Sequence, residues 1–237
     1  QVENIQYKTD KSDIVTEADY QANDIIETAI NSEFPDHIVQ SEENDQTVPT
    51  EGYAWIIDPL DGTGNFAHGN PNYSISIALL KDRIPVVGVV YAPEPADMFY
   101  AIDGRGAYQN DHKIEPTSRS QLDESMLLSG YDPSGEFLQA FYHETQGVRR
   151  LGSAALNLAY VASGSADAVW EHDTHPWDVA AGLCLLREVG GRTTDQYGSS
   201  YELSFNATDQ RTPLLASNGS VHEQLISHID TSDLMSE

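Results

Sequence analysis

Two aspartates separated by two residues follow a short apolar run. The run 53–57 (YAWII) is aromatic and β-branched, as is typical of a strand, and it leads directly into DPLDGTGNF (58–66). Open α/β sheets bind ligands at the carboxyl ends of their strands. We therefore interpret Asp58, Asp61 and the Leu60 carbonyl as candidate hard oxygen ligands for Mg²⁺. Asp-x-x-Asp-Gly alone is also typical of a turn, whereas the whole nine-residue string is much more specific.

The residues after Asp61 are suited to binding an anion. Gly62 and Thr63 are expected to open a turn or a helix. The first backbone N–H groups of a helix have no partner within it, so they bind phosphate well. The Thr63 hydroxyl is placed to orient a water molecule.

Two further acidic positions have both a structural and a chemical interpretation. Glu42 stands in SEEN (41–44), and adjacent glutamates are most often solvated surface residues. Asp178 directly precedes a helix-forming run that begins at Val179, where aspartate is a common N-cap. The same carboxylate could cap the helix and bind a metal ion.

Other catalytic patterns are weak. The chain contains no G-x-x-x-x-G-K-[ST] loop and no G-x-S-x-G elbow. His172 and His175 lack the further Cys or His residues of a zinc site, so we expect them in a loop beside the site. The single cysteine, Cys184, lies in AAGLCLL and is predicted to be a buried structural thiol. Arg149 and Arg150 suit a phosphate, a neighbouring subunit or a structural ion pair.

Hydrophobic periodicity predicts the elements that must position these residues. Helices are expected at 16–30, 153–163, 179–189 and 221–229, and strands at 53–57, 73–80, 84–91, 98–102, 107–109, 168–171 and 213–218. The first half is strand-rich with one early helix, and the second alternates strands and helices, so we predict an α/β protein with an α+β first half. The loosely patterned segment 115–129 suggests two subdomains, 1–120 and 121–237, the first binding metal and phosphate and the second completing the site.

The composition excludes several classes of partner. Twelve Lys and Arg against 38 Asp and Glu give a formal charge of −26. Such a surface argues against nucleic acid and anionic membranes. A hydrophobic content of 39% argues against disorder. The sequence shows no 18-residue apolar stretch and no signal peptide, so a cytoplasmic protein is expected.

The acidity also predicts a dependence of stability on salt. Only four lysines accompany the carboxylates, a composition that suggests a halophilic source. The Debye length is about 3 Å at 1 M salt, so repulsion among surface carboxylates is screened there. We expect the melting temperature to rise with KCl well beyond physiological concentrations. A melting temperature that stays flat from low to molar KCl would contradict this prediction.

With these residues in view, the sequence resembles the inositol monophosphatase family of metal-dependent sugar phosphatases. The resemblance rests on WIIDPLDGTGNF (55–66), HPWDVAAGLCLLREVGG (175–191) and DIVTEAD (13–19), supported by RRLGSAALNLAYVASGSADAVWE (149–171). It covers nearly the whole chain in the same order. It implies a layered α-β-α-β-α sandwich and a homodimer, and the acidic charge already argues against a nucleic-acid or membrane partner.

The resemblance also implies a mechanism, in which a metal-activated water attacks the phosphorus of a small phosphorylated polyol or sugar in line. Two or three Mg²⁺ ions would be held by Glu42, Asp58, Asp61, Asp178 and the Leu60 carbonyl. Glu42, Thr63 and Asp19 would help to activate the water.

In the same way, the resemblance implies the substrate contacts. The amides of Gly62 and Thr63 would hold phosphate, and Lys8 matches a lysine near the metal site. The remaining contacts would come from Asp61, Gly152, Ser153, Ala154, Glu171 and Asp178. Glu171 would accept hydrogen bonds from substrate hydroxyls.

This chain departs from the family pattern at three places. Ser41 replaces the usual glycine before the glutamate pair, and Gly64 stands where Thr or Ser is frequent. The family's first helix, upstream of Lys8, is absent from this sequence. Inositol monophosphate is the expected substrate. Fructose 1,6-bisphosphate or dual specificity is the alternative, and a non-catalytic regulatory role is a remote one.

Overall fold

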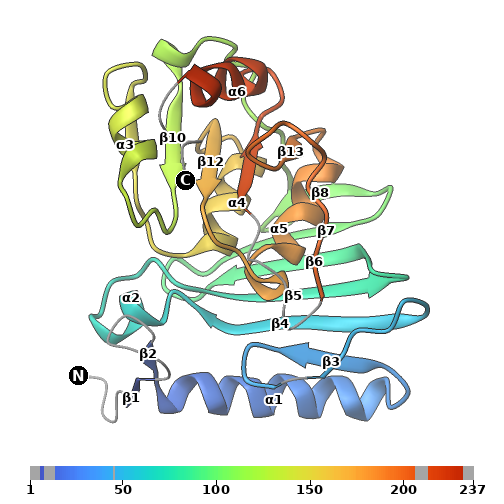
Figure 1. Ribbon diagram of the computed structural model, residues 1–237. Helices are drawn as coiled ribbons and strands as arrows, with labels where there is room; N and C mark the ends of the chain where they lie inside the picture. Colours follow the sequence, from blue (N-terminus) through green and yellow to red (C-terminus); the bar gives the residue numbers. More distant parts are fainter. Residues whose placement is uncertain (1–5, 8–13, 45, 206–212, 232–237) are drawn as a thin grey trace.

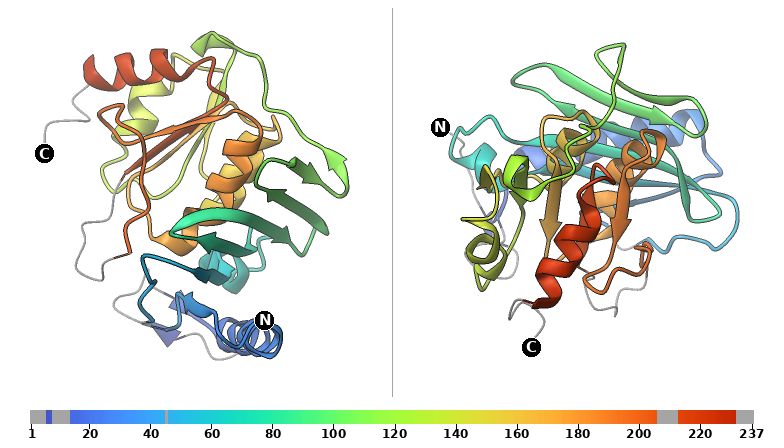
Figure 2. Two further views of the ribbon diagram at one scale, coloured as in Figure 1. Left: turned by 90° about the vertical axis from the view of Figure 1, so that its right-hand side faces the viewer. Right: turned by 90° about the horizontal axis from the view of Figure 1, so that it is seen from above.

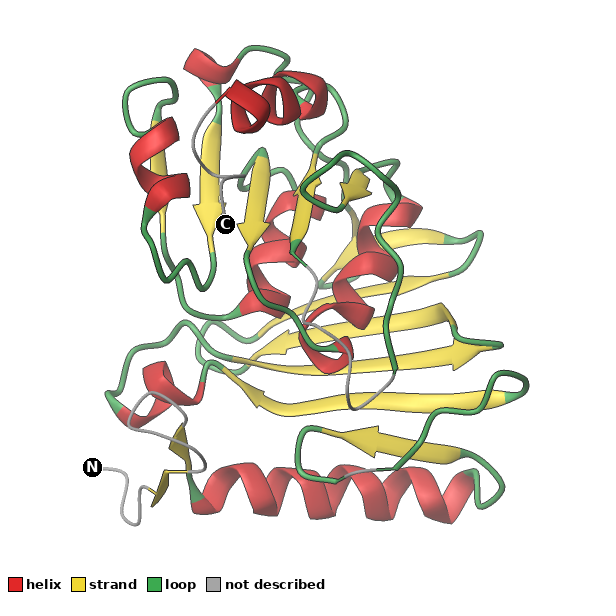
Figure 3. Cartoon of the chain, in the orientation of Figure 1, coloured by secondary structure: helices red, strands yellow, loops and turns green. Residues whose placement is uncertain are grey.

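The structure is a computed structural model that describes residues 6–7, 14–44, 46–205 and 213–231. In this part of the chain, helices and sheets alternate as five stacked layers, α/β/α/β/α (Figure 1, Figure 3). The helices are α1 (Glu17–Glu33), α2 (Thr63–Ala67), α3 (Glu136–Phe141), α4 (Ala154–Ala162), α5 (Pro176–Glu188) and α6 (His222–Thr231), with a 3₁₀ turn, η1 (Leu122–Glu124). This is the layered α/β fold that was expected.

The first sheet has seven strands, and neighbours in the sheet follow one another in sequence. They are β3 (Ile38–Ser41), β4 (Tyr53–Asp61), β5 (Ser74–Lys81), β6 (Ile84–Ala92), β7 (Asp97–Ile102), β8 (Gly106–Gln109) and β9 (His112–Lys113). Only β3 and β4 run parallel, and each later pair is antiparallel. Short hairpins therefore build most of this sheet.

The second sheet is mixed and has the order β11-β10-β12-β14-β13. Its strands are β10 (Met126–Ser129), β11 (Gly147–Arg149), β12 (Ala168–Glu171), β13 (Arg192–Thr194) and β14 (Leu214–Ser217). β10 is parallel to both β11 and β12, whereas β14 is antiparallel to β12 and β13. A separate antiparallel pair, β1 (Gln6–Tyr7) and β2 (Ile14–Val15), precedes α1.

The left view of Figure 2 shows the same layers from the side. Apolar side chains of the described residues form three clusters between these layers. Ile30 of α1 packs with Val39 and Ile57 of the first sheet. The central and largest cluster joins both sheets through α4 and α5. On the outer face of the second sheet, a third cluster joins Phe137 of α3 to Ile229 of α6. The two sheets thus share one core.

Helix α5 approaches the first sheet very closely, at Gly88 of β6. A Cβ at Gly88 would lie 2.9 Å from the Cβ of Cys184 and 3.0 Å from the Cα of Ala181. Cys184 is fully buried, and burial raises the pKa of its thiol to about 11. The prediction of a structural cysteine is confirmed.

Most of the expected elements are present with shifted ends. The turn between β5 and β6 is formed by Asp82 and Arg83, whose φ angles of 52° and 66° suit a two-residue hairpin. The prediction that the strand at 53–57 ends there was wrong, because β4 continues to Asp61. The elements that were missed are β1, β2, β3, β9, β10, β11, β13, α3 and η1. These are short elements whose residues do not show a clear period.

In the described part of the chain, no helix has both the length and the apolar composition needed to cross a bilayer.

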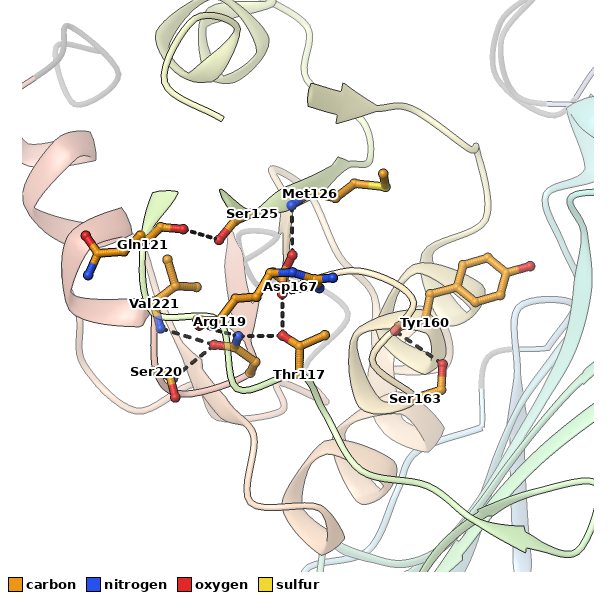
Figure 4. Close-up of polar contacts among 11 residues, drawn as sticks. Thr117, Arg119, Gln121, Ser125, Met126, Tyr160, Ser163, Asp167, Ser220 and Val221 are labelled. Atoms are coloured by element: carbon orange, nitrogen blue, oxygen red, sulfur yellow. Dashed lines mark hydrogen bonds and ion pairs between the residues drawn. The ribbon is translucent and has the colours of Figure 1, made fainter. Parts of the chain in front are cut away.

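A buried aspartate ties the connection between the two sheets to the second sheet (Figure 4). Asp167 is fully buried and accepts hydrogen bonds from the Met126 N–H (2.8 Å) and from the Thr117 hydroxyl. The Arg119 guanidinium lies 3.3 Å from the same carboxylate. Asn218 donates to the Thr117 hydroxyl oxygen at 2.9 Å and to the Arg119 carbonyl at 2.8 Å. The 114–125 segment is therefore anchored by a connected set of polar contacts.

We expect Asp167→Ala to lower the free energy of unfolding by roughly 3 kcal/mol, because it leaves buried donors without an acceptor. Arg119→Ala removes only a partly exposed ion pair and should cost less than about 1 kcal/mol. Urea denaturation at molar KCl measures both variants. Equal, small losses in the two would contradict this interpretation.

Candidate active site

Asp58 and Asp61 lie on one face of β4 because the strand contains a bulge. Side chains three residues apart normally point to opposite faces of a sheet. Here Asp58 pairs with Ser76 and Asp61 pairs with Ser74, so the register shifts by one residue between them. The extra residue brings both carboxylates to the same side as the two serines. Both aspartates are buried, with 3% and 8% of their surface exposed.

Asp61 is held by the beginning of α4. Its carboxylate accepts hydrogen bonds from the Ala154 N–H (3.1 Å), the Ala155 N–H (2.8 Å) and the hydroxyls of Ser153 and Ser74. Burial nevertheless raises the pKa of Asp61 to about 6, while the Ser153 hydrogen bond opposes this change. The contacts join Asp61 to Ser153 and Ala154, two of the predicted substrate residues.

Asp58 is surrounded by like charges. Burial raises its pKa well above the usual range, and the nearby charges of Glu42, Asp61 and Asp178 raise it further. Its hydrogen bond from the Leu60 N–H, at 3.0 Å, has the opposite effect. Three acidic side chains, Glu42, Asp61 and Asp178, are therefore close enough to Asp58 to act on its charge.

Glu42 reaches this cluster because β3 is parallel to β4. Ser41 pairs with Ile57, and the next residue, Glu42, donates its N–H to the Ile57 carbonyl at 3.2 Å. The Ser41 hydroxyl accepts from the Glu43 N–H at 3.2 Å. Glu27 of α1 accepts from the Asn44 amide at 2.7 Å. Serine in place of the family's glycine thus supplies a hydrogen bond within this loop.

Asp178 enters the site in the first turn of α5. The expectation that Asp178 caps a helix starting at Val179 was wrong, because α5 starts at Pro176 and His175 is the N-cap. Asp178 is the third helical residue, and its carboxylate accepts from the His175 N–H at 2.6 Å. This reciprocal contact is a capping box, which fixes the carboxylate at the start of the helix.

Thr63 connects Asp19 to β4. Its hydroxyl lies 3.0 Å from a carboxylate oxygen of Asp19 and 3.0 Å from the Leu60 carbonyl. The other oxygen of Asp19 accepts from the Thr16 N–H at 2.8 Å and the Thr16 hydroxyl at 2.6 Å. Thr16 is the N-cap of α1, so the cap also orients Asp19 towards Thr63.

Gly62 and Gly152 belong to two turns whose backbones lie close together. Gly62 has a φ of +92°, and a Cβ there would lie 3.0 Å from the carbonyls of Asn72 and Gly152. The Asn65 amide crosses between the turns and donates to the carbonyls of Asn72 (2.5 Å) and Leu151 (2.7 Å). By contrast, a Cβ at Gly64 would meet no atom within 4 Å, so the site has room for the family's larger residue there.

Glu171 lies at the end of β12, beside the acidic cluster. Only 3% of its surface is exposed, and burial raises its pKa to about 8. The charges of Asp61 and Asp178 raise the pKa further, whereas a hydrogen bond from Asn157, at 2.8 Å, opposes the change. Glu171 is thus within electrostatic range of two predicted metal ligands.

The donor chemistry at this site fits a hard divalent cation. Carboxylates and a backbone carbonyl are the oxygen ligands that Mg²⁺ prefers, and a cation would offset the repulsion around Asp58. As they are placed, no three His, Cys, Asp or Glu side chains within the described ranges form a ready ligand set for one ion. Asp58, Asp61 and Asp178 are instead each held by hydrogen bonds to backbone N–H groups.

Several residues of the site were not identified from the sequence. Ser74 donates to the Asp61 carboxylate, and Asn157 donates to that of Glu171. Asn65 links the two glycine turns. Asn65 lies inside the 58–66 string, but one of its partners, Leu151, is distant in sequence. Lys8, a predicted neighbour of the site, lies outside the described residues.

Comparison with known proteins supports a single family. Residues 1–234 match the model of the inositol monophosphatase family. An inositol-1-monophosphatase from Synechocystis sp. is 42% identical over 233 residues, which are 94% of this chain and 79% of that protein. A Thermotoga maritima protein named fructose-1,6-bisphosphatase/inositol-1-monophosphatase is 38% identical over 227 residues, 95% of this chain and 86% of that protein.

Solved structures agree with this match. A Thermotoga maritima IMPase has a TM-score of 0.89 at 37% identity, covering 97% of this chain and 88% of that chain. An IMPase/NADP phosphatase complexed with Mg²⁺ and phosphate has a TM-score of 0.87 at 25% identity, covering 96% and 86% of the two chains.

Proposed function

Because the chain belongs to the inositol monophosphatase family and is a phosphomonoesterase, we propose that it hydrolyses inositol monophosphate to inositol and inorganic phosphate with the help of Mg²⁺. The observation that carries the proposal is that Asp58 and Asp61 are buried on one face of β4, with Glu42 just after the parallel strand β3 and Asp178 in the first turn of α5, close enough to act on Asp58. Such a cluster of like charges is costly unless a cation binds it.

The proposed ligands are Glu42, Asp58, Asp61, Asp178 and the Leu60 carbonyl. When bound, Mg²⁺ would neutralise phosphate charge and lower the pKa of a bound water. The bulge of β4, the end of β3 and the first turn of α5 each present part of this ligand set. The local cation also explains how a chain with a formal charge of −26 binds an anionic substrate.

Thr63 and Asp19 are proposed to orient the attacking water and take up its proton. The Thr63 hydroxyl lies between the Leu60 carbonyl and the Asp19 carboxylate, 3.0 Å from each. A hydroxyl in this position can donate to Asp19 and accept from a water. Glu42, on the adjacent strand end, completes the proposed catalytic group.

The substrate is proposed to lie between the two glycine turns and β12. The amides of Gly62 and Thr63 would hold the phosphate. The alcohol portion would contact the segment 152–154, together with Asp61, Asp178 and Glu171. Support comes from the hydrogen bond of the Ala154 N–H to Asp61 and from the action of the Asp61 and Asp178 charges on Glu171. Glu171 would accept a hydrogen bond from a polyol hydroxyl.

A substrate panel at molar KCl with Mg²⁺ tests the choice of substrate. We expect the kcat/KM for inositol 1-phosphate to exceed that for fructose 1,6-bisphosphate. Equal values would establish dual specificity, which the name of the Thermotoga relative favours as the second candidate. Failure to release phosphate from any small sugar phosphate would contradict the enzymatic proposal and favour a regulatory role.

A further inference from the structure

The carboxyl group of Glu171 occupies space that a side chain on the neighbouring strand would fill. β10 and β12 run parallel, with Ser129 opposite Trp170, and the Gly130 N–H donates to the Trp170 carbonyl at 2.8 Å. Gly130 and Glu171 are therefore next to one another at the carboxyl ends of the two strands. A Cβ on Gly130 would fall 2.6 Å from Oε1 of Glu171 and closer still to Cδ and Oε2.

This requirement for glycine is steric. Gly130 is not among the glycines with a positive φ, so its backbone could accept any L residue. The three atoms nearest to the position of a Cβ all belong to the Glu171 carboxyl group, so this group is the first obstacle to a side chain. The absence of a side chain at Gly130 thus leaves the space in which that carboxyl group lies.

The second contact comes from α4, on one side of the sheet. Asn157 is fully buried and donates its Nδ2 to Oε1 of Glu171 at 2.8 Å. Its Oδ1 is buried and has no hydrogen-bond partner among the residues described. A buried polar atom without a partner costs stability, and leucine would fill a helix position of this kind without that cost. The side chain of Asn157 therefore contributes its hydrogen bond to Glu171 at a cost to the stability of the core.

We propose that Gly130 and Asn157 form a seat that positions the Glu171 carboxyl group for the hydroxyls of the substrate, and so contribute to selectivity for polyol phosphates. The inference rests on the proposed function, in which Glu171 contacts the alcohol portion. Gly130 and Asn157 are positioning residues, because they act through Glu171. The seat lies beside the acidic cluster, since the charges of Asp61 and Asp178 act on Glu171.

The test compares two substrates that share the phosphate chemistry. Inositol 1-phosphate has hydroxyls for Glu171 to bind, whereas p-nitrophenyl phosphate has none. We expect Asn157→Ala to raise the KM for inositol 1-phosphate about tenfold, the change that corresponds to the net contribution of one hydrogen bond. The kinetic constants for p-nitrophenyl phosphate should not change. Gly130→Ala should act in the same direction, with Ser129→Ala as the control on the same strand.

A double-mutant cycle separates positioning from general structural damage. Glu171→Gln should show the same selective loss, and Asn157→Ala should add nothing to it in the double variant. The proposal is overturned if Asn157→Ala impairs both substrates equally, or if its effect persists in the Glu171→Gln background. Failure of the wild-type enzyme on both substrates would instead contradict the proposed function itself.

Discussion

Asp58→Asn is expected to lower kcat/KM about a thousandfold, equivalent to roughly 4 kcal/mol of transition-state stabilisation. The amide keeps the shape of the side chain and still accepts from the Leu60 N–H, so the bulge of β4 should survive. It cannot supply the negative charge that a divalent cation requires. Phosphate release from inositol 1-phosphate with saturating Mg²⁺ measures the loss.

The same substitution should raise the melting temperature in the absence of Mg²⁺. Asp58 is buried among Glu42, Asp61 and Asp178, so a neutral side chain relieves repulsion in the metal-free protein. Stabilisation by added Mg²⁺ should be lost at the same time. Asp103→Asn, at an exposed ion pair with Arg187, is the matched control and should leave activity unchanged. Activity close to wild type in Asp58→Asn would refute the assignment.

Thr63→Val should lower kcat about a hundredfold, within the range for a lost proton-transfer group. Valine has the shape of threonine but cannot link Asp19 to the Leu60 carbonyl. The KM should change little, because the phosphate donors in this segment are backbone groups. Thr63→Ser keeps a hydroxyl and should recover most of the rate.

The control for this prediction is Thr145→Val. Thr145 also donates its hydroxyl to a backbone carbonyl, that of Phe141, at 2.9 Å, but it lies outside the site. Unchanged kcat in Thr63→Val, or the same loss in Thr145→Val, would show that the Thr63 hydroxyl does not act on the water.

The sequence indicated which acidic residues are candidates for the site, but not the strand bulge and the helix start that position Asp58, Asp61 and Asp178. The 58–66 string predicted two carboxylates at the end of a strand, because its residue types are local and specific. The bulge that turns both to one face depends on pairing with Ser74 and Ser76, which strand propensity does not reveal. Similarly, Asp178 was expected to cap α5, whereas the proline at 176 begins the helix earlier and leaves this role to His175.

Long-range packing accounts for the residues that sequence reasoning missed. The proposed seat around Glu171 joins Gly130, which follows β10, to Asn157 of α4 and Glu171 of β12, and no local pattern marks Gly130 as sterically required. The short strands β10 and β11 were missed because three or four residues are too few to show the alternation of apolar and polar side chains that predicts a strand. By contrast, α1 and the β5–β6 hairpin have periods and turn residues that suffice to predict them.

The central claim is that the acidic cluster around Asp58 is the metal site of a phosphatase. The most direct measurement is phosphate release from inositol 1-phosphate by EDTA-treated enzyme at molar KCl, as Mg²⁺ is added back. We predict no release without Mg²⁺, a saturable increase with it, and no such increase in Asp178→Asn. Equal release with and without Mg²⁺, or a normal Mg²⁺ response in Asp178→Asn, would contradict the claim.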